Sequence, residues 1–241
     1  MFLRRCLCHI AVVAFSSCGS CSAAVPDVAA RAAVALRAGR VLVEPNFLSG
    51  QQLQEARQAA AALAPGATAA VVGGQTTADK SVRDCDMLDL LDDDVWTALP
   101  SPLTDVVLAI DSLRKELMRT ANRPLIESAE LQLLRYQTGG RYARHVDDGL
   151  GTAFRPVRRS VSFLLYLTPD DWDVSRDGGV LRIHPFGKDD AHSESVVDVA
   201  PNAGTLVLFD SATVPHEVMP TQSPRTAIVG WFLEERTPQQ S

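Results

Sequence analysis

The spacing of apolar side chains predicts that the first half of the chain is mostly helical. A helix is expected over residues 101–121, where apolar residues recur on one face at helical spacing. These residues are Val106, Val107, Ile110, Leu113 and Leu117. Two shorter helices are predicted, one over 26–40 with Pro26 near its start, and one from Ser49, a common N-cap residue type, to Ala64.

Less regular segments separate these helices. Residues 41–43 are typical of a short strand, and the small, polar residues 67–81 are expected to form a loop. The acidic run 88–94 indicates either a solvated face or the start of a helix.

The second half of the chain, after Pro124, is predicted to be rich in β-structure. Short runs of β-branched and aromatic residues alternate with Gly, Pro, Asp and Asn. They cover residues 130–137, 157–167, 179–183, 195–199, 204–209 and 225–233. Many short strands with turn signals favour a sandwich or a barrel. The predicted fold class is therefore mainly β with N-terminal helices (α+β), in which a helical layer supports a β core.

Length and charge narrow the possible functions. The chain has 241 residues, of which 46% are hydrophobic and 22% charged, as expected for one globular domain with a sizeable core. Lys and Arg number 23 against 29 Asp and Glu, which gives a net charge of −6. Because an acidic surface repels phosphate groups, no nucleic-acid partner is expected. No apolar run approaches the length of a membrane-spanning helix, so no transmembrane anchor is expected.

The first 24 residues resemble a targeting presequence. Arg4 and Arg5 precede an apolar stretch at 6–15, and the small residues of 22–24 could accept cleavage. The alternative is a frayed N-terminal tail. A true presequence would direct the protein to the secretory pathway or an organelle, whereas without one it would be cytoplasmic.

Four of the five cysteines fall inside this segment. Their spacing could also indicate zinc, but the segment is apolar at its centre and lacks the turns of a zinc site. They are Cys6, Cys8, Cys18 and Cys21. If the segment is removed after Ala24, only Cys85 remains, so the mature fold cannot rely on an internal disulfide.

The histidines of the second half suggest a metal centre. His145 and Asp147 are two residues apart, so on a strand both side chains would point to one face. Two imidazoles and one carboxylate form the facial set that binds Fe(II) in oxygenases, and His216 is the candidate for the third ligand. Arg225 follows nine residues later and could bind a carboxylate in the same cavity through two parallel hydrogen bonds.

At this level of detail the sequence resembles the Fe(II)- and 2-oxoglutarate-dependent oxygenases of the prolyl 4-hydroxylase group, and within it the hypoxia-inducible-factor prolyl hydroxylases. The similarity is strong over 129–233 and weaker upstream. Its main segments are 135–147 (RYQTGGRYARHVD), 166–168 (YLT), 171–173 (DWD), 178–183 (GGVLRI), 208–209 (LF), 215–218 (PHEV) and 225–232 (RTAIVGWF).

The resemblance implies a double-stranded β-helix, the distorted jelly roll of that superfamily. It implies that His145, Asp147 and His216 bind iron and that Arg225, together with Tyr166, holds the distal carboxylate of 2-oxoglutarate. Tyr136 and Tyr142 match aromatic positions that line the cavity, although all three tyrosines could instead be core aromatics. The implied cofactors and cosubstrates are Fe(II), 2-oxoglutarate, O2 and ascorbate.

The function expected from these residues is hydroxylation of an unactivated carbon, with release of succinate and CO2. A protein or peptide carrying proline is the expected substrate. Oxidation of a small molecule or another side chain by the same centre is an alternative, as is a non-catalytic metal-binding β-barrel. The expected regions are a presequence (1–24), a helical support (25–128) and a dioxygenase domain (129–236), and the oligomeric state is left open.

Other reactive side chains are expected to have structural roles. His184 is interpreted as a hydrogen-bonded histidine, His192 as solvated, Cys85 as a packing residue and Arg182 as part of a surface salt bridge. Asp148 departs from the family, in which Asn often follows the metal-binding Asp, and the loop at 67–81 also differs. These departures leave the substrate unspecified.

Overall fold

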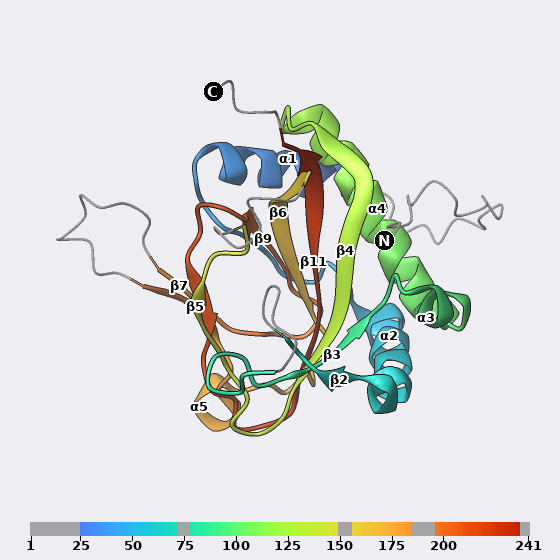
Figure 1. Cartoon of the computed structure of the whole chain (residues 1–241), viewed down its shortest axis with the longest axis vertical. Coiled ribbons are helices and arrows are strands. Elements are labelled where there is room, and N and C mark those ends of the chain that lie inside the picture. The colour runs from blue at the N-terminus through green and yellow to red at the C-terminus, as the bar shows by residue number, and fades with distance from the viewer. Residues whose placement is uncertain (1–24, 72–77, 149–155, 185–195, 237–241) are drawn as a thin grey trace.

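The computed structural model describes residues 25–71, 78–148, 156–184 and 196–236 (Figure 1). Helices cover one face of a large β-sheet, and a smaller sheet lies on its other face. The predicted presequence and His192 lie outside the described residues, as does the centre of the predicted loop at 67–81.

All three predicted helices are present. They are α1 (Val25–Arg37), α2 (Gly50–Leu63) and α4 (Ser101–Thr120). Ser49 occupies the N-cap of α2, although its side chain makes no capping hydrogen bond there. The helix α2 ends at Leu63, one residue before the predicted end at Ala64, and a 3-10 turn over Ala64–Gly66 follows it.

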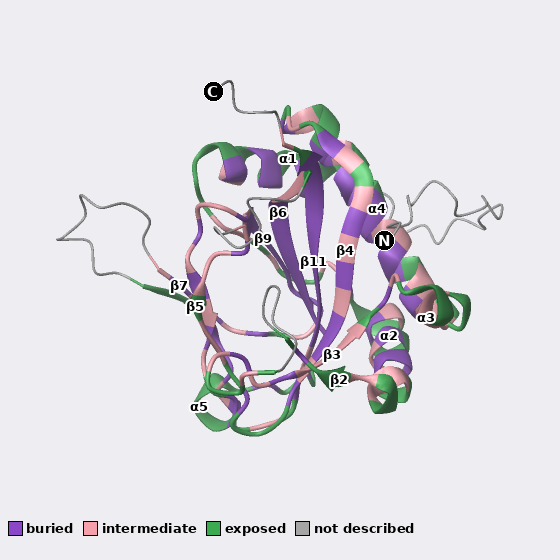
Figure 2. Ribbon diagram, viewed as in Figure 1, coloured by how far each residue is buried: buried purple, intermediate pink, exposed green. Residues whose placement is uncertain are grey.

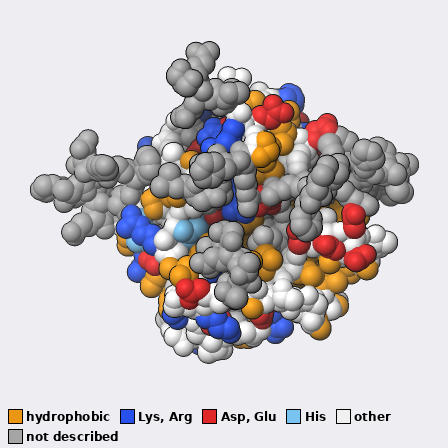
Figure 3. Space-filling view, viewed as in Figure 1, with side chains coloured by type: hydrophobic (Ala, Val, Ile, Leu, Met, Phe, Trp, Pro, Cys, Tyr) orange, Lys and Arg blue, Asp and Glu red, His pale blue; other side chains and the backbone are white. Residues whose placement is uncertain are grey.

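Two shorter helices, α3 (Asp93–Thr97) and α5 (Val174–Asp177), complete the set. The carboxylate of Asp92 accepts the backbone N–H groups of Asp94 and Val95, so the acidic run does begin a helix. Figure 3 shows these exposed acidic side chains gathered over α3, on the right of the face that is drawn.

The larger sheet has seven strands in the order β1-β9-β6-β11-β4-β3-β2, each antiparallel to its neighbours. Its strands are β1 (Leu42–Glu44), β2 (Thr68–Ala69), β3 (Asp86–Asp89), β4 (Leu125–Tyr136), β6 (Val157–Tyr166), β9 (Leu206–Asp210) and β11 (Arg225–Glu235). The smaller sheet has the order β5-β10-β7-β8. Its strands are β5 (Tyr142–His145), β7 (Leu181–Ile183), β8 (Val197–Val199) and β10 (His216–Val218). The fold is a double-stranded β-helix.

The larger sheet separates two hydrophobic clusters, because side chains alternate between its faces. On β4, Leu131 and Leu133 pack with the helices, whereas Leu134 and Tyr136 face the smaller sheet. Figure 2 shows β6 and β11 buried along most of their length, as expected for strands covered on both faces. The inward positions near the ends of these strands are therefore where a buried site can be built.

Three strands of the larger sheet come from the region expected to be a helical support. β1 pairs with β9, and β3 joins β2 to β4, so this region extends the sheet as well as covering it. The expectation that 67–81 would be a loop was wrong for β2, which pairs with β3 through Thr68 and Ala69. Among the described residues, the helices are too short or too polar to span a bilayer.

Candidate active site

Three ligand-type side chains converge between the two sheets. His145 ends β5, and His216 begins β10 directly opposite it in the antiparallel register. Asp147 lies beyond the end of β5. One potential ligand atom from each of the three residues lies within 4.8 Å of the others. The structure therefore brings together the three residues that the sequence proposed as metal ligands.

The reason for this proximity differs from the one expected. His145 and Asp147 do not share a strand face, because β5 ends at His145. Instead, the backbone N–H of Asp147 donates to the carbonyl oxygen of Ser211 at 3.0 Å, which turns the chain toward the imidazoles. A loop hydrogen bond, rather than strand alternation, places this carboxylate.

Backbone carbonyls orient both imidazole rings. Nδ1 of His145 lies 2.8 Å from the carbonyl oxygen of Ala143, and Nδ1 of His216 lies 3.0 Å from that of Val214. Because a carbonyl oxygen can only accept, Nδ1 carries the proton and each Nε2 offers a lone pair. The two Nε2 atoms lie 3.4 Å and 3.7 Å from the carboxylate oxygens of Asp147. This is the arrangement that metal-binding histidines adopt.

The electrostatics favour the protonation states that a divalent cation requires. Burial opposes ionisation of Asp147, but attraction to His216 and His145 in their protonated forms, with a smaller contribution from Arg159, holds the pKa of the carboxyl below its usual range. Burial lowers the pKa of the His216 imidazole, which keeps this ring neutral. Two imidazoles and a carboxylate, with further positions open, are the donor set typical of non-haem Fe(II) oxygenases.

A buried cation lies between the same two sheets. Arg225 opens β11, is fully buried and pairs in register with Tyr136 of β4. Its guanidinium carbon lies 4.9 Å from the ring centre of Tyr166 and 5.2 Å from that of Tyr136. Among the described residues, the three guanidinium nitrogens and the Tyr166 hydroxyl make no hydrogen bond of normal geometry, although the guanidinium lies close enough to the phenol to counteract the rise in its pKa that burial causes.

Such an arrangement calls for an anionic ligand. Buried polar groups in native proteins are almost always hydrogen-bonded, and an unpaired buried charge is strongly destabilising. A carboxylate that accepted from Arg225 and Tyr166 would satisfy both groups at once. The residues present therefore fit the distal carboxylate of 2-oxoglutarate.

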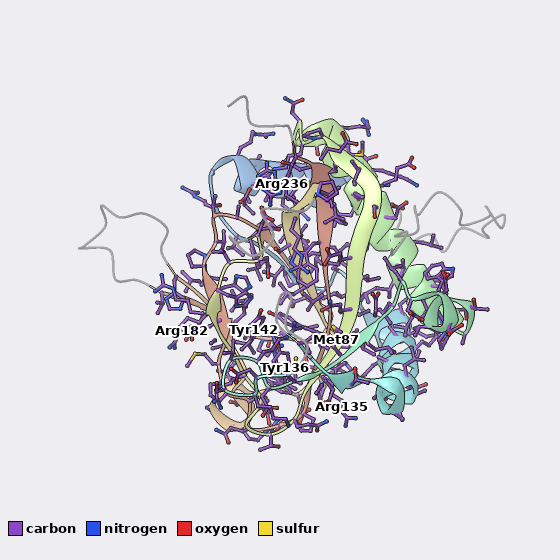
Figure 4. All side chains as sticks on the ribbon, viewed as in Figure 1. Met87, Arg135, Tyr136, Tyr142, Arg182 and Arg236 are labelled. Carbon is purple, nitrogen blue, oxygen red and sulfur yellow. The ribbon has the colours of Figure 1, made fainter. Side chains whose placement is uncertain are left out.

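The remaining tyrosines line the cavity between the sheets, as Figure 4 shows for Tyr136 and Tyr142. The Tyr142 ring stacks on His145 with ring centres 3.7 Å apart, and the guanidinium of Arg83 lies 4.9 Å from its centre. Burial raises the pKa of both Tyr136 and Tyr142, so both phenols stay neutral. These tyrosines therefore lie between the two sheets, and Arg83 adds a buried basic side chain beside Tyr142.

Several contributors were not singled out in the sequence. Ser162 and Ser211 contact Asp147, and Arg159 donates to its carbonyl oxygen while lying 3.6 Å from the Trp231 ring centre. Strand alternation could have found Ser162, which is a polar residue at an inward position of an apolar strand. Nothing in the local sequence marks Ser211, because its role depends on contact with Asp147, which follows β5 and is far from Ser211 in the sequence.

The structural interpretations of the other residues are confirmed. His184 lies 2.9 Å from the carboxylate of Glu217, and Arg182 makes two 2.8 Å hydrogen bonds to Asp198 near the surface. Cys85 is buried and accepts a hydrogen bond from Nε of Arg83 at 3.3 Å.

Comparison with known proteins agrees with this geometry. Residues 131–233 match the 2OG-Fe(II) oxygenase superfamily. The hypoxia-inducible factor prolyl hydroxylase of Caenorhabditis elegans is 31% identical over 134 residues, which cover 54% of this chain and 17% of that protein. Human Egl nine homolog 1 is 37% identical over 97 residues, or 40% of this chain and 20% of that protein. The matches thus span about a fifth of these relatives.

Solved structures are similar over more of the chain. A Pseudomonas putida prolyl-4-hydroxylase aligns with a TM-score of 0.68 and 28% identity, covering 87% of this chain and 100% of that one. A Trichoplax adhaerens prolyl hydroxylase, solved with a hypoxia-inducible-factor peptide, aligns with a TM-score of 0.75 and 21% identity over 90% of this chain and 94% of that one. The sequence match over residues 131–233 and the similar fold show a 2OG-Fe(II) oxygenase domain with homology to the hypoxia-inducible factor prolyl hydroxylases.

Proposed function

We propose that the protein is an Fe(II)- and 2-oxoglutarate-dependent dioxygenase that hydroxylates a prolyl residue of a peptide or protein. The observation that carries the proposal is a buried His-Asp-His cluster together with a buried guanidinium that makes no hydrogen bond of normal geometry, both between the same two sheets. A non-catalytic metal-binding barrel would need the first of these features but not the second. The alternative of a scaffold is therefore disfavoured.

Each residue then has a defined task. His145, Asp147 and His216 would hold Fe(II) on one face, and Arg225 and Tyr166 would bind the distal carboxylate of 2-oxoglutarate. When bound, Fe(II) would activate O2, of which one oxygen atom enters the substrate and the other enters the succinate that forms, with CO2, from 2-oxoglutarate; ascorbate would keep the iron reduced. The protein orients the cosubstrate and keeps water from its charged end, because Arg225 and Tyr166 are fully buried.

The proline substrate is supported by the relatives. The Caenorhabditis elegans relative is named as a prolyl hydroxylase, and the Trichoplax structure holds a peptide fragment. Oxidation of a small molecule or a different side chain by the same centre is the competing outcome, since the same fold also occurs in the nogalamycin-biosynthesis proteins SnoN and SnoK.

Mass spectrometry of proline peptides tests the proposal directly. The full chain would be incubated with Fe(II), 2-oxoglutarate, ascorbate and O2, and both succinate and peptide mass would be followed. We expect a gain of one oxygen atom on proline, matched by succinate. His145→Ala should abolish both products, and His184→Ala serves as the matched control because His184 pairs with Glu217 outside the cluster.

The outcomes separate the alternatives. If succinate formed but proline was not oxidised in any of a broad set of peptides, the proposed prolyl substrate would be wrong, and a small molecule or another side chain would be the substrate. Absence of Fe(II)-dependent succinate, or succinate production that His145→Ala leaves unchanged, would refute the oxygenase assignment for this site.

A further inference from the structure

Two buried serines support Asp147 at the proposed iron site, and one of them contacts its carboxylate. Ser162 lies on β6, and its hydroxyl donates to Oδ2 of Asp147 at 2.6 Å. The hydroxyl of Ser211, which follows β9, lies 2.8 Å from that of Ser162. Both serines are fully buried, so water does not replace either contact.

The direction of these hydrogen bonds follows from the number of available protons. A carboxylate oxygen can only accept, so the single hydroxyl proton of Ser162 is used on Asp147. Ser211 must then donate to Ser162. Each donor in such a chain polarises the next, which strengthens the hydrogen bond to the charged carboxylate.

Ser211 also holds the backbone of the loop. Its carbonyl oxygen accepts from the N–H groups of both Asp147 and Asp148 at 3.0 Å, and its own N–H donates to the carbonyl oxygen of Ser160. The preceding residue, Asp210, is fixed by an ion pair with Arg123 at 2.6 Å. The support of Asp147 is therefore built on paired strands rather than on the loop alone.

The geometry assigns Ser162 and Ser211 as positioning residues for the iron ligand, an inference that rests on the proposed function. The Ser162 hydroxyl holds the Asp147 carboxylate in place and makes Oδ2 the weaker donor, so Oδ1, 3.4 Å from Nε2 of His145, would be the metal-binding atom. One donor per protein ligand keeps three positions of a six-coordinate iron open. Chelation by 2-oxoglutarate and binding of O2 need these three positions.

Titration of the metal-free protein with Co(II) tests this role without turnover. Visible absorption of Co(II) gives the dissociation constant for the wild type and for Ser162→Ala, Ser162→Thr and Ser160→Ala. We expect Ser162→Ala to weaken Co(II) binding about 10- to 100-fold, and Ser162→Thr, which keeps the hydroxyl, to restore most of it.

Ser160→Ala is the matched control. Ser160 lies on the same strand and is also buried, but its hydroxyl bonds Glu234 and Arg123 and not Asp147. Its variant should bind Co(II) as the wild type does. Circular dichroism spectra and unfolding curves of each variant establish that the compared proteins are folded.

A double-mutant cycle sharpens the test. Because the Ser211 hydroxyl acts through Ser162, Ser211→Ala should weaken Co(II) binding less than Ser162→Ala does, and add nothing in the Ser162→Ala background. Equal Co(II) affinity of folded Ser162→Ala and Ser160→Ala, or fully additive effects in the cycle, would overturn the inference. If His145→Ala also bound Co(II) like the wild type, the iron site itself, and with it the proposed function, would fail.

Discussion

The guanidinium of Arg225 lies beside the ring of Tyr166, both side chains are fully buried, and among the described residues their polar groups make no hydrogen bond of normal geometry. The protein thus keeps a charge desolvated before any ligand arrives. Because an unpaired buried charge opposes folding, this arrangement favours binding of a carboxylate over protein stability.

Arg225→Met should therefore separate stability from cosubstrate binding. We expect the free energy of unfolding of the ligand-free protein to stay the same or rise, because the variant removes an uncompensated charge. In the wild type loaded with Mn(II), 2-oxoglutarate at 100 times its dissociation constant should add about 2.7 kcal/mol. This increment should vanish in Arg225→Met. Urea unfolding with and without 2-oxoglutarate measures both effects.

Arg182→Met is the control, since that guanidinium is paired with Asp198 near the surface. It should keep the full stabilisation by 2-oxoglutarate. A folded Arg225→Met protein that 2-oxoglutarate still stabilised fully would contradict the proposed clamp.

The stability of the metal-free protein should depend on pH through His216. Burial lowers the pKa of this imidazole below its ordinary value of 6.5. Below pH 6.5 the unfolded chain therefore binds a proton at this position that the folded protein does not, so stability falls as pH decreases and is regained above 6.5. The contribution of one such group is at most about 1.4 kcal/mol per pH unit.

Urea unfolding at pH 7.5 and 5.5 measures this dependence after chelation of metal ions. His216→Gln should lose less stability than the wild type between the two pH values. His184→Gln should keep the pH dependence of stability that His216 causes in the wild type. Identical slopes for the wild type and His216→Gln would show that this imidazole does not titrate differently on folding.

The long helices and strands could be predicted because apolar residues recur at the characteristic spacing over several helical turns or several strand residues. The helix α4 buries one face, and the inward side of β11 follows from the alternation of Ala227 and Val229, which also directs Arg225 into the cavity. The resemblance to a known family then supplied roles for residues that the pattern had placed.

The short strands could not be predicted in the same way. β5 and β10 span four and three residues, and they carry site residues rather than an apolar repeat. Their existence depends on pairing His145 with His216, which are far apart in the sequence. The position of Asp147 likewise depends on a hydrogen bond to Ser211. The spacing of His145 and Asp147 therefore selected two residues that do come together, but not through the shared strand face that was expected.

A buried ion pair beneath the sheet should make a large contribution to stability. Arg114 of α4 is almost fully buried and donates to the Asp111 carboxylate at 2.7 and 2.9 Å, and to the carbonyl oxygen of Ile126 at 3.0 Å. It therefore joins α4 to the start of β4. Because Lys115 still pairs with Asp111, we expect Arg114→Ala to cost about 3 kcal/mol, at the low end for a broken buried pair.

The same helix offers a matched exposed pair. Arg119 and Glu116 have the same spacing and lie 2.6 Å apart, but the arginine side chain is 72% exposed. Arg119→Ala should cost at most about 1 kcal/mol. If urea unfolding showed similar losses of free energy of unfolding for Arg114→Ala and Arg119→Ala, the buried pair would contribute no more to stability than the exposed one.

Gly204 is the backbone position where a side chain should be least tolerated. Its φ of +72° is unfavourable for other residues, and an added Cβ would lie 2.0 Å from the carbonyl oxygen of Leu48. The Leu48 N–H also donates to Gly204, so this contact joins the start of α2 to the segment before β9. Gly204→Ala combines backbone strain with a backbone clash and should cost about 3 kcal/mol or more.

Gly139 separates the two contributions. Its φ is +86°, but no atom lies within 4 Å of an added Cβ, so Gly139→Ala carries the strain without the clash. We expect this variant to lose only about 1–2 kcal/mol. Equal losses for both alanine variants in urea unfolding would mean that the segment before β9 moves to accommodate a side chain. The close contact between Leu48 and Gly204 would then not hold α2 against the sheet.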